Sequence, residues 1–150
     1  MKNIFSKDDS DEFINRINQL KNDFQPLWGK MSVNQMLAHC NVTYEMVYDN
    51  IHKKPNAFMK FFLKSFVKKN VINEVPYTRN IRTAPQFIIS RDCNFDFEKE
   101  RLIKYIIKTQ ELGESEFNEK ESLSFGKLNS KEWNIMFAKH LDHHLSQFGV

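Results

Sequence analysis

The sequence has few of the residues that mark disulfide-rich, fibrous or membrane-spanning proteins. Of its 150 residues only two are cysteine, four are glycine and four are proline. Two cysteines cannot build a disulfide framework, and such low usage fits a reducing compartment. No apolar run approaches the roughly 20 residues that cross a bilayer, and the N-terminal residues lack the apolar segment of a signal peptide. We therefore expect a cytoplasmic protein without membrane-spanning segments.

An excess of charge of one sign is also missing. The chain carries 22 Lys and Arg against 19 Asp and Glu, a formal net charge of +3. This small excess gives no reason to expect nucleic-acid binding. A hydrophobic content of 41% and the chain length are typical of a globular protein, and we see no internal repeat. The prediction is one domain that spans residues 1–150.

Apolar residues recur at helical spacing in the first third of the chain. A first helix is predicted to run to about Phe24, with Pro26 ending it. A second helix is predicted to begin after Ser32, because Gln35 three residues later completes a capping box. Its core face includes Met36, Leu37, Cys40 and Tyr44.

Two further long helices are predicted in the second half. The third begins at Asn94 or Asp96 and is closed by Gly113. The fourth begins at Asn129, with Glu132 at the capping-box position, and runs close to the C-terminus. The expected fold is therefore all-α: a four-helix bundle with a long crossover and an extra short amphipathic helix between helices two and three.

Residues 57–69 form that short helix, and they are both amphipathic and basic. Aromatic and basic side chains segregate to different sides: Phe58, Phe62 and Phe66 against Lys60, Lys64 and Lys68. Such a helix can lie on an anionic membrane or pack its aromatic face on its own bundle. We expect packing, because the segment is short and the net charge is small. A peripheral membrane or polyanion-binding module remains the alternative function.

Two stretches interrupt the helical pattern. Residues 71–94 contain Pro76 and Pro85 and read as an ordered, extended connection, which in a compact domain is often a functional lid. Its residues 87–89 fit either a short strand or an apolar plug over the bundle. Residues 114–127 are predicted to be a polar loop.

Three of the five histidines lie in the last predicted helix. His140 and His144 are one turn apart on the stripe that also carries Trp133, Phe137 and Phe148, so both imidazoles should face the core. Two such imidazoles can chelate one transition metal. The simpler alternative is a pair of core histidines with ordinary hydrogen bonds, but the aromatic neighbours offer few partners.

The remaining histidines and one glutamine lie at less decisive positions. His39 lies at the edge of the core face of the second helix, where either a metal ligand or a surface histidine is found. His143 lies on the flank of the last helix, and Gln147 returns to the stripe one turn later. His52 falls among lysines at a helix end, and we expect it to be exposed to solvent.

The strings around these histidines resemble a known family. W-G-K-M-S-V-N-Q-M-L-A-H, F-G-K-L-N-S-K-E-W and H-L-D-H-H-L-S-Q-F-G are similar to a branch of the DinB-like, or YfiT-like, superfamily of metal-dependent bundle enzymes. The resemblance implies that His39, His140 and His144 bind a divalent metal, zinc or nickel. It leaves His143 and Gln147 as candidates for supporting the ligands. Better-known members carry H-R-G-Q at the last position, where this chain has H-L-S-Q.

The resemblance also implies a class of chemistry. A three-histidine site with an open position is of the catalytic type, so the expectation is a metal-dependent enzyme, a thiol-dependent transferase or a hydrolase. Its partner would be a small-molecule substrate, with a low-molecular-weight thiol as possible cosubstrate, and the protein a monomer or homodimer. Leu141 stands where H-E-x-x-H proteases carry their glutamate, which disfavours a protease. The alternative is a bundle that keeps the metal only for structure.

Overall fold

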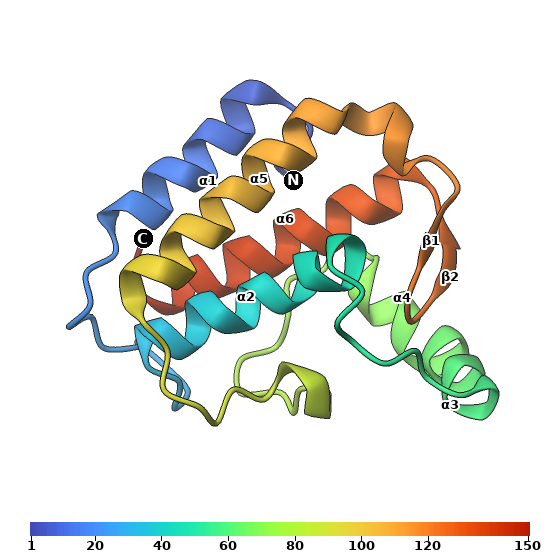
Figure 1. The fold of residues 1–150 in the computed structure, drawn as a ribbon, viewed down its shortest axis with the longest axis horizontal. Helices are drawn as coiled ribbons and strands as arrows, with labels where there is room; N and C mark the ends of the chain where they lie inside the picture. Colours follow the sequence, from blue (N-terminus) through green and yellow to red (C-terminus); the bar gives the residue numbers. More distant parts are fainter.

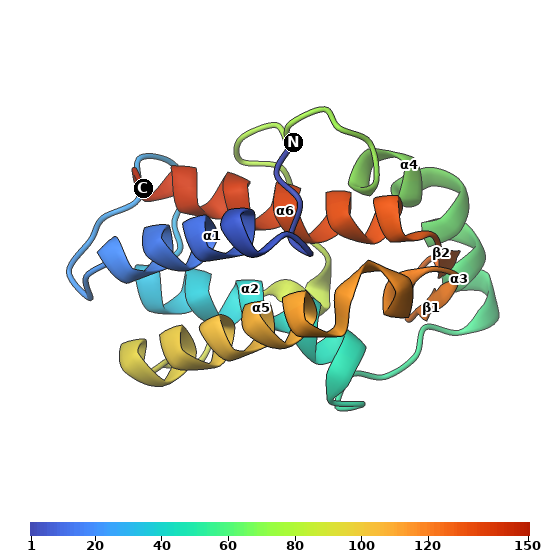
Figure 2. The same cartoon turned by 90° about the horizontal axis from the view of Figure 1, so that it is seen from above.

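The computed structural model describes residues 1–150 and is mostly helical (Figure 1). The long helices are α1 (Lys7–Gln19), α2 (Val33–Tyr48), α5 (Phe95–Phe117) and α6 (Ser130–Gln147). Helices α1 and α2 each pack against both α5 and α6, and Figure 2 shows the four side by side. The predicted all-helical class is thus confirmed apart from one small hairpin. No helix has the length and apolar character needed to traverse a lipid bilayer.

One hydrophobic core lies between the four long helices. Its largest fully enclosed side chains come from all of them and include Phe13, Tyr44, Leu102, Trp133 and Phe137. The stripe predicted for the last helix, which includes Trp133 and Phe137, therefore faces the core. The polar residues on the same stripe are directed into the bundle.

The predicted helix starts are confirmed by their caps. Ser32 with Gln35 and Asn129 with Glu132 each form a complete capping box at the start of α2 and α6. The predicted end of the first helix is wrong, since α1 stops at Gln19. The apolar spacing continues to Phe24, but only through a turn that packs on the core without helical hydrogen bonds.

The short helix between α2 and α5 has three consecutive parts, α3 (Ala57–Phe62), the π-helical turn η1 (Leu63–Val67) and α4 (Lys68–Val71). The expectation that its aromatic face packs on the bundle is wrong, because the phenylalanines are exposed. An aliphatic row packs against the core instead, formed by Leu63, Val67 and Val71. The aromatic row and the aliphatic row are both apolar, and the sequence pattern alone favoured the larger, aromatic row as the face that packs on the core.

The stretch predicted to be a polar loop contains a hairpin. Strands β1 (Lys120–Ser122) and β2 (Gly126–Leu128) pair antiparallel, with Glu121 opposite Lys127. Three-residue strands are too short to show a clear alternation of polar and apolar residues. Gly113, at φ 74°, interrupts α5 where the helix was expected to close.

The connection of residues 71–94 runs over one side of the bundle. Its only regular element is the 3₁₀ turn η2 (Pro85–Phe87), which contacts α2. Of the two alternatives for this segment, the plug therefore describes it better than a strand. The prolines impose this irregular course by withholding backbone donors.

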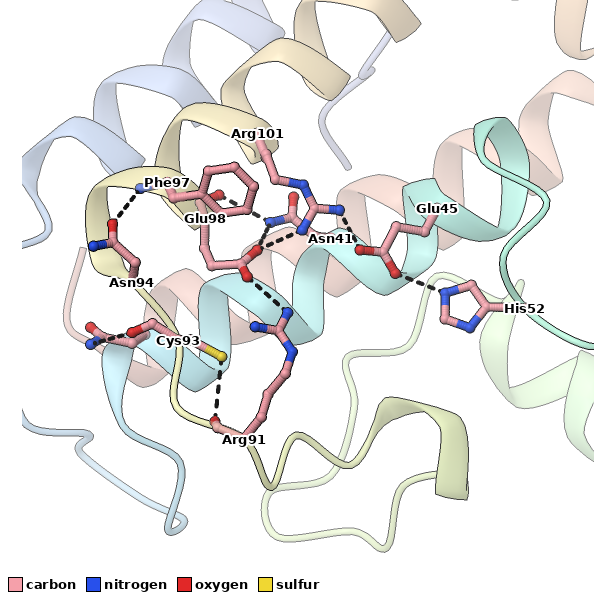
Figure 3. A network of polar contacts seen from close by, with 10 residues as sticks. Asn41, Glu45, His52, Arg91, Cys93, Asn94, Phe97, Glu98 and Arg101 are labelled. Carbon is pink, nitrogen blue, oxygen red and sulfur yellow. Dashed lines mark hydrogen bonds and ion pairs between the residues drawn. The ribbon is translucent and has the colours of Figure 1, made fainter.

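A network of charged groups joins α2 to α5 (Figure 3). The fully buried Glu98 accepts hydrogen bonds from Asn41 at 2.9 Å, from Arg101 at 2.8 Å and from Arg91 at 2.8 Å. Arg101 also pairs with Glu45, whose second oxygen lies 2.8 Å from His52 Nε2. The predicted exposure of His52 is therefore wrong, because Glu45 draws this ring against α2.

Candidate metal centre

The three histidines predicted to be ligands meet in the structure. His39 comes from α2, and His140 and His144 come from successive turns of α6. One ring nitrogen from each lies within 4.8 Å of the others, and the Nε2 atoms of His39 and His140 are 3.0 Å apart. Residues 101 positions apart in the sequence thus form one cluster of nitrogen donors.

The helix faces explain this convergence. His39 and His144 are only 3% and 7% exposed, because each lies on the side of its helix that packs against the other. His140 is partly exposed and completes a triangle, with ring centroid distances of 4.9 Å to His39, 4.7 Å to His144 and 4.5 Å between His39 and His144. Helical spacing places the two histidines of α6 one turn apart, and the packing of α2 against α6 brings His39 to them.

The Nδ1 atom of every histidine in the cluster faces an oxygen of the protein. His39 Nδ1 lies 2.8 Å from the carbonyl oxygen of Phe87, His140 Nδ1 lies 3.1 Å from Thr43 Oγ1, and His144 Nδ1 lies 2.9 Å from Gln147 Oε1. The Phe87 carbonyl and Gln147 Oε1 can only accept, so they keep the proton on Nδ1 of His39 and His144 and leave each Nε2 with a free lone pair. The Thr43 hydroxyl can accept from His140 Nδ1 as well, and in that tautomer all three rings offer Nε2 as a ligand.

Burial keeps these imidazoles neutral. It lowers the pKa of His39, and it lowers the pKa of His144 to about 3, with the neighbouring His39 adding to the effect. The pKa of His140 is lowered well below its ordinary value by burial and by the two other rings. Neutral imidazole is the form that binds a metal, so protons do not compete for these nitrogens near pH 7.

Gln147 holds His144 in place, as a supporting residue would. Its Nε2 donates to the carbonyl oxygen of Trp28 at 2.7 Å, which turns Oε1 towards His144. The loop before α2 comes so close that a Cβ on Gly29 would lie 2.6 Å from Gln147 Nε2. Gly29 also has φ +82°, a conformation that side chains disfavour. The absence of a side chain therefore permits both this turn and the close approach of Gln147.

His143, the other candidate for a supporting role, contacts the cluster only through its ring. Its ring packs edge-on against Trp28 and Tyr77, at centroid distances of 5.8 Å and 5.6 Å. It lines a neighbouring cavity of about 340 Å³ together with Tyr77 and Lys139. Arg79 stacks on the outer face of Trp28 at 4.1 Å. His143 therefore lies at the rim of the cluster, where its ring also packs edge-on against His144 at a centroid distance of 5.0 Å, but it makes no hydrogen bond to any of the three rings.

Two residues of the site were missed by sequence reasoning. Thr43 lies one helical turn after His39, and this spacing was the available signal for its contact with the cluster. Phe87 contributes a backbone carbonyl and packs its ring 5.3 Å from His39 and 5.9 Å from His140. A backbone acceptor leaves no pattern in the side chains, so the contact between His39 and the Phe87 carbonyl could be found only from the structure.

The donor set suits a borderline transition metal. Zn–N bonds of about 2.0–2.1 Å at tetrahedral angles separate imidazole nitrogens by about 3.3 Å, which falls between the shortest and longest separations in the cluster. No fourth His, Cys, Asp or Glu joins the group. Cys40 is buried in the core with its pKa raised, and the Asp142 carboxylate faces solvent and pairs with Arg16. A fourth position would fall to water or a substrate atom.

Comparison with known proteins gives one match. The model of a family described as "Protein of unknown function (DUF1569)" matches residues 2–149, nearly the whole chain. No curated protein and no solved structure matches the chain.

Proposed function

We propose that this chain, which belongs to the DUF1569 family, is a metalloprotein that binds a divalent ion through His39, His140 and His144. Zinc or nickel fits the all-imidazole donor set best. The proposal includes kinship with the DinB-like superfamily, supported by the bundle of α1, α2, α5 and α6 and by the origin of the ligands in α2 and α6.

One observation carries the proposal: each Nδ1 lies against a protein oxygen, an arrangement in which the three Nε2 atoms can bind one ion. Metal-binding histidines almost always use their second nitrogen in this way, because the contact fixes the tautomer and the ring orientation. A metal-free cluster could satisfy part of itself, with His140 Nε2 donating to His39 Nε2 and His140 Nδ1 accepting from Thr43. His144 Nε2 would still have no hydrogen-bond partner in the protein, and a metal would give it one.

The expected chemistry is that of an enzyme with an open metal position. A bound divalent ion there would supply a Lewis acid that lowers the pKa of water to about 7 or binds a thiolate. The protein provides neutral ligands, the fixed rings and a cover formed by Phe87. We therefore propose a thiol-dependent transferase or a hydrolase acting on a small molecule.

Elemental analysis of untagged protein tests the metal site. We expect near-stoichiometric zinc or nickel in the wild type and its loss in His39→Ala and His144→Ala. The matched control is His52→Ala. It removes a histidine that contacts Glu45 of α2 outside the cluster, so this variant should keep the metal. A folded wild type that takes up no ion from excess zinc or nickel would contradict the proposal.

Cobalt substitution separates a catalytic from a purely structural ion. Co²⁺ bound by the three histidines should give visible absorption bands, and an added low-molecular-weight thiol should produce a thiolate-to-cobalt charge-transfer band. A closed structural site would leave the spectrum unchanged, because no position would be open to the thiol.

A further inference from the structure

The segment from Asn50 to Asn73 differs from the rest of the chain in its charge. It contains six lysines and no aspartate or glutamate, whereas the whole chain has 22 basic and 19 acidic residues. Four of the six lysines form no ion pair: Lys53, Lys54, Lys64 and Lys69. The modest net charge of the protein therefore conceals one strongly cationic region.

The same segment exposes most of its aromatic surface. The outward phenylalanines are Phe58 at 78% exposure, Phe61 at 66%, Phe66 at 64% and Phe62 at 45%. At helical spacing they cover one continuous side of α3 and η1. The opposite side is anchored to the core through Leu63 and Val67, so rotation of the helix cannot hide these rings. Single exposed apolar residues are ordinary, but a group of four marks an interaction surface.

A cationic cavity borders the aromatic side. It has a volume of about 660 Å³ and lies between α3, η1, α4 and the hairpin, lined by Phe61, Lys60, Lys64, Lys68 and Lys127. Its single acidic residue, Glu121, is already paired with Lys60 at 2.8 Å. Ammonium groups around one cavity attract a phosphate group.

We propose that α3 and η1 dock the protein on an anionic phospholipid membrane. The four phenylalanines enter the interface between headgroups and acyl chains, and the cavity beside Phe61 receives a lipid phosphate. Figure 1 supports this geometry, since α3 projects at one end of the molecule beside the hairpin, away from the four long helices. The membrane would thus be reached without disturbing the bundle.

Charge distinguishes this occupant from a second copy of the chain. A symmetric dimer through this face would bring the lysines that line the cavity of one copy close to the same lysines of the other. An anionic bilayer instead supplies the opposite charge to the lysines and an apolar layer to the phenylalanines at the same time. The histidine cluster takes no part, so this proposal does not rest on the metal site.

Co-sedimentation with vesicles tests the proposal on the full-length protein. We expect binding to phosphatidylcholine vesicles that contain phosphatidylserine, little binding to pure phosphatidylcholine, and weakening by salt. Phe58→Ser combined with Phe61→Ser should weaken binding about tenfold or more, and Lys64→Gln with Lys127→Gln about tenfold. These side chains are exposed, so the variants should fold.

Matched controls replace exposed residues elsewhere. Phe97→Ser with Ile81→Ser, which are 56% and 68% exposed, and Lys21→Gln with Lys30→Gln should leave vesicle binding unchanged. His39→Ala should also bind normally, which separates this result from the fate of the metal proposal.

Three outcomes would overturn the proposal. The first is no sedimentation with phosphatidylserine vesicles at low salt. The second is binding that depends on the lysines but survives loss of the phenylalanines, because this is electrostatic adsorption without insertion. The third is a wild-type dimer in analytical ultracentrifugation that becomes monomeric in the phenylalanine variant, together with no binding to vesicles. This result would assign the face to self-association.

Discussion

Helix α2 carries two polar clusters that differ in how their hydrogen-bonding capacity is used. Around Asn41 and Glu45, each buried carboxylate meets guanidinium or amide donors, and the charges largely compensate one another (Figure 3). Around His39, protein oxygens lie at the three Nδ1 atoms, while the Nε2 atoms of His39 and His140 face each other at 3.0 Å. The first cluster pairs its charges within the protein, although Asn41 Oδ1 has no partner, and packing explains it. Ring nitrogens that gather at one place instead indicate a ligand.

The strongest test of this comparison removes the buried carboxylate. Glu98→Ala leaves Arg101 and the Asn41 amide with unmatched donors inside the interface of α2 and α5. We expect the free energy of unfolding to fall by about 3–5 kcal/mol, as measured by urea denaturation. Metal content per folded molecule should not change, and its loss would mean that the two clusters are not separate.

Acid should affect the histidine cluster in the metal-free protein. The unfolded chain protonates its histidines near pH 6.5, while in the folded chain the pKa of His144 is about 3. Stability is therefore complete above pH 6.5 and declines as the pH falls towards 3, because the unfolded state binds the extra proton. From pH 6.5 to 4.5 we expect His144 alone to account for a loss of about 2 kcal/mol.

Denaturation of chelator-treated protein across this range measures the effect. His39 and His140 shift in the same direction, so the wild type should lose more than His144 alone accounts for. In His144→Gln the decline should be shallower by the contribution of one histidine. An unchanged slope in this variant would mean that His144 is not buried as a neutral ring.

Two glycine substitutions test whether Gln147 holds the metal ligand His144 in place. Gly29→Ala would place its Cβ 2.6 Å from Gln147 Nε2, which must move and release His144. We expect metal affinity to fall about tenfold, since contacts of this kind are worth 10–100-fold. Gly113→Ala is the control, because its φ of +74° carries similar backbone strain while its Cβ has nothing within 4 Å. Competition with a chromophoric chelator should show a loss in Gly29→Ala only.

The smallest effect is expected at the exposed side of α6. Asp142→Ala removes an ion pair with Arg16 at 2.8 Å, with the carboxylate 62% exposed. Such pairs contribute about 0–1 kcal/mol, and metal content should stay the same. A large loss of metal or of activity in this variant would show that a charge facing solvent acts on the site.

Local signals in the sequence were sufficient for the starts of α2 and α6 and for the histidine stripe, but not for the end of α1. Capping boxes placed the starts of α2 and α6, and helical spacing brought His140 and His144 onto one buried face. The position of His39 could only be assigned by resemblance, since its spacing fitted a surface histidine equally well. Nothing in the sequence located the carbonyl of Phe87, because a backbone acceptor has no side-chain signature.

The largest error concerns α3, and it has a physical cause. Periodicity shows that a helix has an apolar face, but it does not show which of two apolar faces is anchored. In this segment a row of aliphatic residues, Leu63, Val67 and Val71, competes with the row of phenylalanines and occupies the core. The net charge misled in the same way, because Asp and Glu outside residues 50–73 offset the six lysines of this segment when the whole chain is summed.

The contact between His39 and the carbonyl of Phe87 joins the metal ligand to a segment with little regular structure. The 3₁₀ turn of residues 85–87 lies within the long connection of residues 71–94, so the tautomer of His39 depends on whether this connection is seated. A departing turn would take away both the acceptor and the ring that covers the cluster. The rate at which this connection opens would then limit how fast an ion or a substrate exchanges with solution. The residence time of that ion or substrate would depend on the connection as much as on the three ligands.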